Sequence, residues 1–193
     1  MKKILIIGSN SFAGSNFTDY LLDKNFKVYG VSRSKEIKKE HLSYKKNKKL
    51  KNFKFFRINL NLRKDIYRLI QIVKNQKIQY IANFAAQGMV AESWIKPEDW
   101  YFTNVVSNSI LIKELSKLKI KKYLNFSTPE VYGNTSSLMK ESNIFAPTTP
   151  YAISRSAQDF NLLAHFKTFN FRKRNTTNKS MHGIFKLILK VVA

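Results

Sequence analysis

The sequence alternates short apolar runs with longer stretches of helical character, and this order constrains the fold more than any other feature. The runs are rich in Ile, Val, Phe and Tyr, and they lie at 2–8, 27–34, 53–60, 78–86 and 121–128. They are largely continuous in their apolar character, which is typical of strands that are buried on both faces. The alternation therefore predicts an α/β fold, with a parallel sheet and helices on both of its faces.

Four stretches between and after these runs predict helices, at 15–26, 62–76, 97–118 and 151–169. The second repeats apolar residues at the spacing of one helix face, at Leu62, Ile66, Leu69, Ile70 and Val73. Pro97 is placed in a first helical turn, where its missing N–H costs nothing. Residues 35–57 contain ten basic and two acidic residues, and we interpret them as a solvated, lysine-rich loop and helix.

Composition excludes several kinds of site. The 193 residues suffice for one domain with its own core, and the absence of cysteine rules out disulfides, thiolate metal ligands and a cysteine nucleophile. The three histidines lie far apart without ligand spacing, so we expect no metal site. The formal net charge of +23 raises the question of nucleic acid or another anionic partner. No run approaches the ~18 apolar residues of a membrane span, so we expect a cytoplasmic protein without a membrane partner.

The segment "GSNSFAG", residues 8–14, joins the first expected strand to the first expected helix. Gly8 permits a tight turn and Gly14 permits close packing of helix against strand, while the N–H groups at the start of the helix suit a pyrophosphate. Ser11 stands where the pattern has a middle glycine, and Phe12 follows it. A strand, a glycine turn and a helix in this order are typical of dinucleotide binding, so we place these four residues at a cofactor.

The end of the second expected strand indicates which dinucleotide is bound. An acidic side chain there binds the ribose 2′-hydroxyl of NAD, whereas an arginine suits the 2′-phosphate of NADP. This chain has Ser32, Arg33 and Ser34 in that place, with no acid before Glu36. The sequence therefore favours NADP over NAD, with Arg33 as the phosphate partner.

Five segments in order resemble those of one enzyme family: "GSNSFAG", "NFAAQ", "TNV", "STPEVYG" and "PYAISR". From about Lys2 to Phe171 the chain is similar to the N-terminal part of extended short-chain dehydrogenases/reductases. Within them it resembles the NAD(P)-dependent nucleotide-sugar epimerases and dehydratases, with GDP-mannose 4,6-dehydratase-like members nearest. The resemblance implies a Rossmann-type doubly wound sheet, NADP or NAD as cofactor and a nucleotide sugar as substrate. It also places Asn59, Leu60, Ala85 and Ala86 at the cofactor, with Asn59 where the family often has an Asp that contacts adenine.

The resemblance also implies the catalytic residues. Tyr151 matches the tyrosine that takes part in proton transfer with the sugar hydroxyl, and Thr128 matches the residue that hydrogen-bonds the sugar oxygen beside it. Glu130 stands where the dehydratases have a carboxylate that removes a proton during elimination. Arg155 replaces the lysine that holds the nicotinamide ribose and lowers the pKa of the tyrosine. Arginine keeps the positive charge, but it is longer and planar.

The kind of reaction stays open among three choices. Glu130 favours a dehydratase, or a decarboxylase with a similar pattern, over a simple 4-epimerase. Pro129 stands where dehydratases of the dTDP-glucose type have an acidic Asp, which favours the GDP-mannose type. In each case the family oxidises a sugar hydroxyl with the bound cofactor and later returns the hydride.

The resemblance fades near Phe171, and this predicts two regions. Residues 1–171 are expected to form the NAD(P)-binding Rossmann domain. Residues 172–193 form a basic and apolar tail without a match, which indicates a truncation or a shift of reading frame. We expect the C-terminal substrate domain of the family to be missing, and turnover to be impaired.

Two rival functions and one partner complete the expectations. The first rival is a Rossmann module that binds dinucleotide without catalysis, which Arg155 favours. The second is a nucleic-acid binder that uses residues 35–54, although we expect this basic segment to be a solvated surface. Family members commonly pair as dimers through helices that here run near 97–118 and 150–170, so we expect a homodimer.

Overall fold

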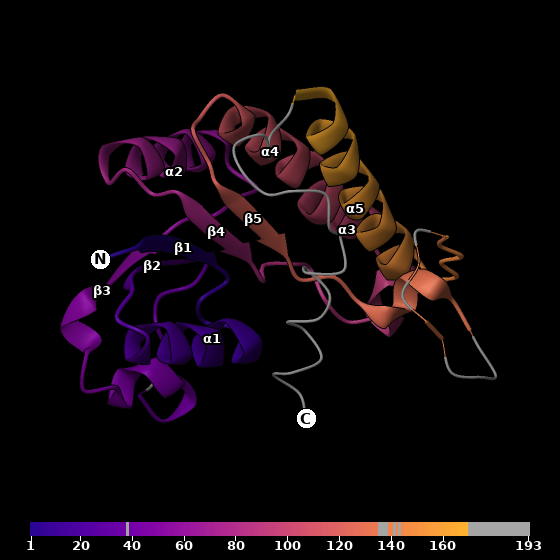
Figure 1. The fold of residues 1–193 in the computed structure, drawn as a ribbon. Helices are drawn as coiled ribbons and strands as arrows, with labels where there is room; N and C mark the ends of the chain where they lie inside the picture. The colour runs from indigo at the N-terminus through magenta and orange to yellow at the C-terminus, as the bar shows by residue number, and fades with distance from the viewer. Residues whose placement is uncertain (38, 135–138, 141, 143, 170–193) are drawn as a thin grey trace.

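The computed structural model describes residues 1–37, 39–134, 139–140, 142 and 144–169. At its centre is a parallel sheet of five strands in the order β3-β2-β1-β4-β5 (Figure 1). All five expected strands are confirmed: β1 (Lys3–Ile7), β2 (Lys27–Ser32), β3 (Phe53–Arg57), β4 (Tyr80–Asn83) and β5 (Lys122–Asn125). The strand order reverses at β1, which pairs with β2 on one side and with β4 on the other.

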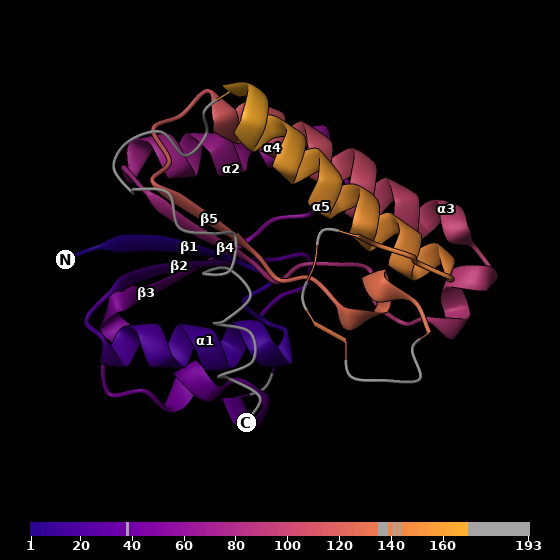
Figure 2. The ribbon, with the colours of Figure 1, turned by 45° about the vertical axis from the view of Figure 1, so that its right-hand side comes forward.

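Helices cover both faces of the sheet, as the alternation predicts. Helix α1 (Phe12–Asp23) lies on one face, and α2 (Arg63–Asn75), α4 (Asn108–Ser116) and α5 (Pro150–Phe169) lie on the other (Figures 1 and 2). The fold is therefore a doubly wound α/β sheet of the Rossmann type. No helix in the described part of the chain has the length and apolar character needed to cross a membrane.

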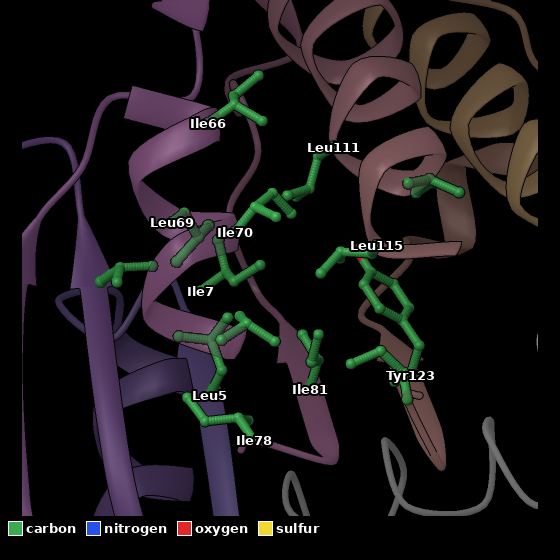
Figure 3. Packing of buried hydrophobic residues seen from close by; sticks show 14 of the residues in the cluster. Leu5, Ile7, Ile66, Leu69, Ile70, Ile78, Ile81, Leu111, Leu115 and Tyr123 are labelled. Atoms are coloured by element: carbon green, nitrogen blue, oxygen red, sulfur yellow. The ribbon is translucent and has the colours of Figure 1, made fainter. Parts of the chain in front are cut away.

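The larger core lies between the sheet and the layer of α2 and α4. Figure 3 shows Leu5 and Ile7 of β1 and Ile81 of β4 packed toward residues from these helices. Helix α2 supplies the predicted apolar face, with Ile66, Leu69, Ile70 and Val73 buried. Leu62 is the exception, because it precedes the helix in an extended conformation and is exposed.

The connection from β2 to β3 differs from the expected loop and helix. Its described residues form short 3₁₀ turns in place of a helix, η1 (Lys39–His41), η2 (Ser43–Lys46) and η3 (Leu50–Asn52). Leu42 and Tyr44 are fully buried in a second core beneath α1, and the Tyr44 ring lies 4.4 Å from that of Phe53. Leu42 and Tyr44 thus pack this basic segment against the domain, while many of its lysines are exposed to solvent.

The connection from β4 to β5 runs through a short turn, η4 (Ala91–Trp94), and then a long helix. Pro97 stands at the start of α3 (Pro97–Trp100), as expected from its missing N–H. The helix then widens into π-helical turns over Tyr101–Ser107, η5, and returns to α-helical geometry in α4. After β5 comes a 3₁₀ turn, η6 (Pro129–Tyr132), before the chain reaches α5.

Candidate functional site

A cavity of about 310 Å³ opens where the strand order reverses. It lies at the carboxyl ends of β1, β2 and β4, the place where doubly wound sheets bind ligands. The described part of the chain contributes no carboxylate to its walls, and Arg33 is the basic residue there. Seven of the residues that we predict at the cofactor line it: Gly8, Ser11, Arg33, Asn59, Leu60, Ala85 and Ala86.

Gly8 brings the backbones of two strand ends close together at the floor of the cavity. Its φ is +84°, and a Cβ on it would lie only 2.8 Å from the Ala85 nitrogen. Gly14 is equally restricted, because a Cβ there would lie 2.2 Å from the Gly8 carbonyl oxygen. The structure therefore requires glycine at both positions, for the turn and for the close approach of α1.

Ser11 folds its side chain back into the turn. Its hydroxyl donates to the Gly8 carbonyl oxygen at 2.7 Å and accepts from the Gly14 N–H at 3.1 Å. Serine thus caps α1 in the place of the middle glycine. Phe12, the first residue of α1, has a side chain that is 87% exposed, and neither Phe12 nor Gly14 is among the lining residues of the cavity.

Asn59 and its neighbours form a polar wall after β3. The Asn59 side-chain oxygen accepts from the Asn61 N–H at 3.1 Å, and a carbonyl oxygen keeps a second lone pair for another donor. Asn61 in turn donates to the Thr103 hydroxyl at 3.0 Å and accepts from Ser107 at 3.0 Å. The wall is therefore fixed against the π-helical turns of η5.

Asn104, in the middle of η5, connects the edge of the cavity to α5. Its side-chain oxygen accepts from the Gln87 N–H at 2.8 Å, and its amide donates to the Gln87 carbonyl at 3.0 Å and to the Ser154 hydroxyl at 2.9 Å. The side chain is completely buried. The wider turns of η5 thus aim one amide at two separate parts of the chain, and π-helical turns often occur at functional sites.

The residues predicted to be catalytic lie at or just before η6 and in the first turns of α5, two elements that pack against one another (Figure 2). Thr128 precedes η6, and its hydroxyl lies 3.4 Å from the Glu130 N–H as a cap. Tyr151 lies in the first turn of α5, where its N–H donates to Ser93 at 3.2 Å. The cavity lining drawn from the described residues includes neither these three nor Arg155.

Arg155 is buried, with 3% of its surface exposed. Its Nη2 donates to the carbonyl of Phe126 at the end of β5. Burial lowers the pKa of the guanidinium, while the nearby Tyr151 and Asp159 oppose that shift. Nε and Nη1 have no hydrogen-bond partner among the described residues. The guanidinium therefore binds the backbone just after β5 and does not line the cavity. Its role at a cofactor stays a prediction.

A model of the family described as GDP-mannose 4,6 dehydratase matches residues 5–183. The chain belongs to this family. The matched range continues past Phe171, where the sequence predicts a domain boundary, and residues 170–193 lie outside the described part of the chain.

Individual proteins that are similar to this chain agree with its assignment to the family. The chain is 30% identical to a dTDP-D-glucose 4,6-dehydratase of Dictyostelium discoideum, over 95% of this chain and 44% of that protein. It is 27% identical to a GDP-mannose 4,6-dehydratase of Vibrio cholerae, over 89% of this chain and 46% of that protein. The chain thus spans about half the length of the curated relatives that it matches.

Solved structures show the same fold. A UDP-Glc/GlcNAc 4-epimerase of Campylobacter jejuni superposes with a TM-score of 0.78 at 24% identity, over 90% of this chain and 51% of that one. A dTDP-glucose 4,6-dehydratase of Bacillus anthracis in complex with NAD has a TM-score of 0.73 at 25% identity, over 89% of this chain and 52% of that one.

In this member of the GDP-mannose 4,6 dehydratase family, a buried polar network joins α5 to the segment after β5, near the residues predicted to be catalytic. Asp159, one turn after Arg155, accepts from Asn125 at 2.7 Å and from the Ser127 hydroxyl. Burial raises the pKa of Asp159, and hydrogen bonds from Ser127 and Asn125 and the charge of Arg155 oppose that shift. Since Ser127 precedes Thr128, Asp159 fixes the strand end that carries a candidate catalytic hydroxyl.

Several residues of the site have no signal of their own in the sequence. Their individual roles depend on partners far along the chain. Asn125 and Asp159, for example, are 34 positions apart. The missed residues are Asn10, Asn61, Gln87 and Thr103 in the cavity wall, and Asn104, Asn125 and Asp159 in the supporting networks.

Proposed function

We propose that this chain forms the dinucleotide-binding half of an NAD(P)-dependent nucleotide-sugar 4,6-dehydratase or epimerase. The observation that carries the proposal is the cavity at the strand reversal, whose floor is a glycine that admits no Cβ. A turn of this kind lets a pyrophosphate approach the backbone at the start of α1. The dTDP-glucose 4,6-dehydratase of similar fold in complex with NAD supports the assignment.

We infer that the cofactor is NADP rather than NAD. Arg33 lies at the cavity wall, and the described lining residues contain no carboxylate to receive a ribose 2′-hydroxyl. An exposed guanidinium can bind a phosphate through two parallel hydrogen bonds. Asn59 and Leu60 would then lie near the adenine and Ala85 and Ala86 nearer the nicotinamide.

The nicotinamide ring would accept a hydride from the sugar and return it later. In our proposal Tyr151 accepts the proton of the sugar hydroxyl during oxidation, and Thr128 orients that hydroxyl by a hydrogen bond. Glu130 then removes the proton next to the transient ketone, which elimination of water requires. Arg155 supplies positive charge near Tyr151, in agreement with their electrostatic interaction. Glu130 favours dehydration over simple epimerisation.

The substrate and its surroundings follow from the family. We propose a nucleotide sugar as the substrate, and turnover that depends on the C-terminal substrate domain implied by the resemblance. A cytoplasmic location fits such a substrate. The homodimer that the resemblance implies would use the long helix of α3, η5 and α4 together with α5.

Binding of NADPH to the intact chain tests the proposal. The fluorescence of NADPH should rise when it binds the chain. Gly8→Ala should abolish that rise, because the new Cβ would collide with the Ala85 backbone. Gly88→Ala is the matched control, since a Cβ there meets nothing within 4 Å. Equal binding by both variants would contradict the proposed site.

A second candidate function is dinucleotide binding without catalysis. The observation that favours it is Arg155, which is buried against the Phe126 carbonyl and lies outside the lining of the cavity. The two functions differ when the chain is incubated with NADP⁺ and either GDP-mannose or dTDP-glucose. A 4-keto-6-deoxy product that is lost in Tyr151→Phe supports the enzyme, whereas tight NADPH binding without product supports the binding module.

A further inference from the structure

One side chain of the glycine turn holds the loop that follows β2. The side-chain amide of Asn10 donates to the Lys35 carbonyl oxygen at 2.9 Å, and it lies 3.4 Å from both the carbonyl and hydroxyl oxygens of Ser34. The Asn10 backbone N–H donates to the Ser32 hydroxyl at 3.0 Å. A single residue thus binds both ends of the loop that carries Arg33.

The same loop is held from its other side by β3. The Nε of Arg57 donates to the Arg33 carbonyl oxygen at 3.1 Å, and the Arg57 carbonyl in turn accepts from Arg68 at 3.4 Å. The backbone around Arg33 is therefore fixed from two directions, whereas the Arg33 side chain is exposed at the cavity wall. The loop backbone is thus fixed, while the Arg33 side chain stays at the cavity wall and available to a ligand.

The orientation of Asn10 depends on its amide donor. Its side-chain oxygen is buried and has no hydrogen-bond partner among the described residues. The contacts that set the side chain are therefore those of Nδ2 to the Ser34–Lys35 backbone. A carboxylate at the same position would lose these donors and would add a buried negative charge beside the loop.

We propose that Asn10 is a positioning residue that selects NADP over NAD, because it orders the loop that presents Arg33 and Ser34 to the 2′-phosphate. This inference rests on the proposed dinucleotide function. A loop that is already ordered loses less conformational entropy when it binds a ligand. Only a ligand with a 2′-phosphate uses the loop in this way, so the gain goes to NADP and not to NAD.

Calorimetric titration of the intact chain with NADP⁺ and with NAD⁺ tests the proposal, since the two ligands differ only in the 2′-phosphate. Wild-type chain should bind NADP⁺ more tightly. Asn10→Ala should lower the ratio of the two affinities by about fivefold, the value of one net hydrogen bond, and should change NAD⁺ binding by less than about twofold. Asn10→Asp should lower the ratio further, because its charge repels the phosphate.

Two further variants make the test decisive. Ser32→Ala removes the acceptor of the Asn10 backbone N–H, a second contact between the glycine turn and the loop. It should also lower the ratio, so the idea stays testable if Asn10→Ala fails to fold. Asn75→Ala removes an exposed amide at the end of α2 and should leave both affinities unchanged.

Each contrary outcome has its own meaning. Equal loss of both ligands in Asn10→Ala would show a purely structural role and would overturn the inference. An unchanged ratio, or a wild-type preference for NAD⁺, would overturn it and leave dinucleotide binding intact. Failure of the wild-type chain to bind either ligand would overturn the proposed function and this inference with it.

Discussion

Asp159 and Arg155 show how a buried charged side chain is supported by neighbours from other elements. Asp159 accepts hydrogen bonds from two side chains at the end of β5, and the charge of Arg155 lies one helical turn away. Each bond replaces water that the carboxylate loses on burial. The pair therefore depends on an intact connection between β5 and α5.

Replacement of Asp159 by asparagine tests that dependence. One acceptor oxygen becomes a donor amide, which leaves either Asn125 or Ser127 without its acceptor, while Arg155 loses its nearby negative charge. We expect the free energy of unfolding to fall by about 1–3 kcal/mol in urea denaturation at pH 7. Asp99→Asn on the exposed surface of α3 is the control, with a change below about 0.5 kcal/mol. Equal stability of the two variants would contradict the account.

Two buried tyrosines predict how stability changes in alkali. Burial raises the pKa of both Tyr44 and Tyr123 well above the ordinary value of 10.0. The unfolded chain therefore ionises first, and it binds fewer protons than the folded chain above pH 10. Stability is fully present below pH 10 and declines as the pH rises toward the pKa values of the folded state.

The double variant Tyr44→Phe, Tyr123→Phe should flatten this decline. Each tyrosine contributes at most about 1.4 kcal/mol per pH unit to the slope, and phenylalanine contributes none. Urea denaturation at several pH values between 9 and 11.5 measures the slopes. A variant whose stability falls as steeply as that of the wild type would show that other groups dominate alkaline unfolding.

Individual residues differ in how far the sequence predicts them. Gly8 and Gly14 are recognisable because their requirement is local, a turn and a close packing within one segment. Asn10 and Asp159 are not, because each acts on residues more than twenty positions away in the chain. Only the folded sheet brings such partners together, and no local pattern records them.

The π-helical turns of η5 make a prediction about a whole element. Asn104→Ala removes three hydrogen bonds that join Gln87 to Ser154, and it leaves the partly buried Gln87 backbone groups without these partners. We expect unfolding to become easier by about 2–4 kcal/mol, and NADPH affinity to fall because Gln87 belongs to the cavity wall. Thermal unfolding and fluorescence titration measure the two effects.

Ser109→Ala serves as the control for Asn104→Ala. It lies on the following helix, and its hydroxyl donates only to the Val105 carbonyl within the helix itself. This variant should change stability by less than about 1 kcal/mol and leave NADPH binding unaltered. Loss of NADPH binding in both variants would indicate that the helix as a whole, and not Asn104, sets the cavity wall.

Strands and helices were predictable where one pattern governed a whole segment. The buried strands and the amphipathic face of α2 follow from hydrophobic periodicity, and the start of α3 follows from Pro97. The wide turns of η5 have no such signal, because the partners of Asn104 within them, Gln87 and Ser154, lie 17 and 50 positions away along the chain. The segment between β2 and β3 differs from its prediction as a solvated loop and helix. Its many lysines indicate an exposed surface, but Leu42 and Tyr44 within it are buried.

The exposed faces of η5 and α5 support the prediction that two copies of the chain form a dimer. Apolar side chains are exposed on η5 and α5, namely Phe102, Val106, Ile153 and Phe160. Light scattering after gel filtration should detect a dimer of the intact chain, and Phe102→Glu should shift it to monomer by placing a charge in the contact. Tyr67→Glu on α2 is the control, because Tyr67 is exposed to a similar degree, 49% against 47%. A wild-type monomer, or a dimer in Phe102→Glu, would contradict the assignment.

The position of β1 in the middle of the sheet affects the order in which the protein can be built. The chain makes β1 first, but one edge of that strand is covered only when β4 pairs with it. During synthesis the ribosome must therefore release residue 83 before the Ile4–Ile7 segment is enclosed. A half-made chain carries an open apolar strand for all of that interval, and such intermediates are prone to aggregate. Chaperone binding to nascent chains should consequently be strongest before β4 emerges and fall once it does.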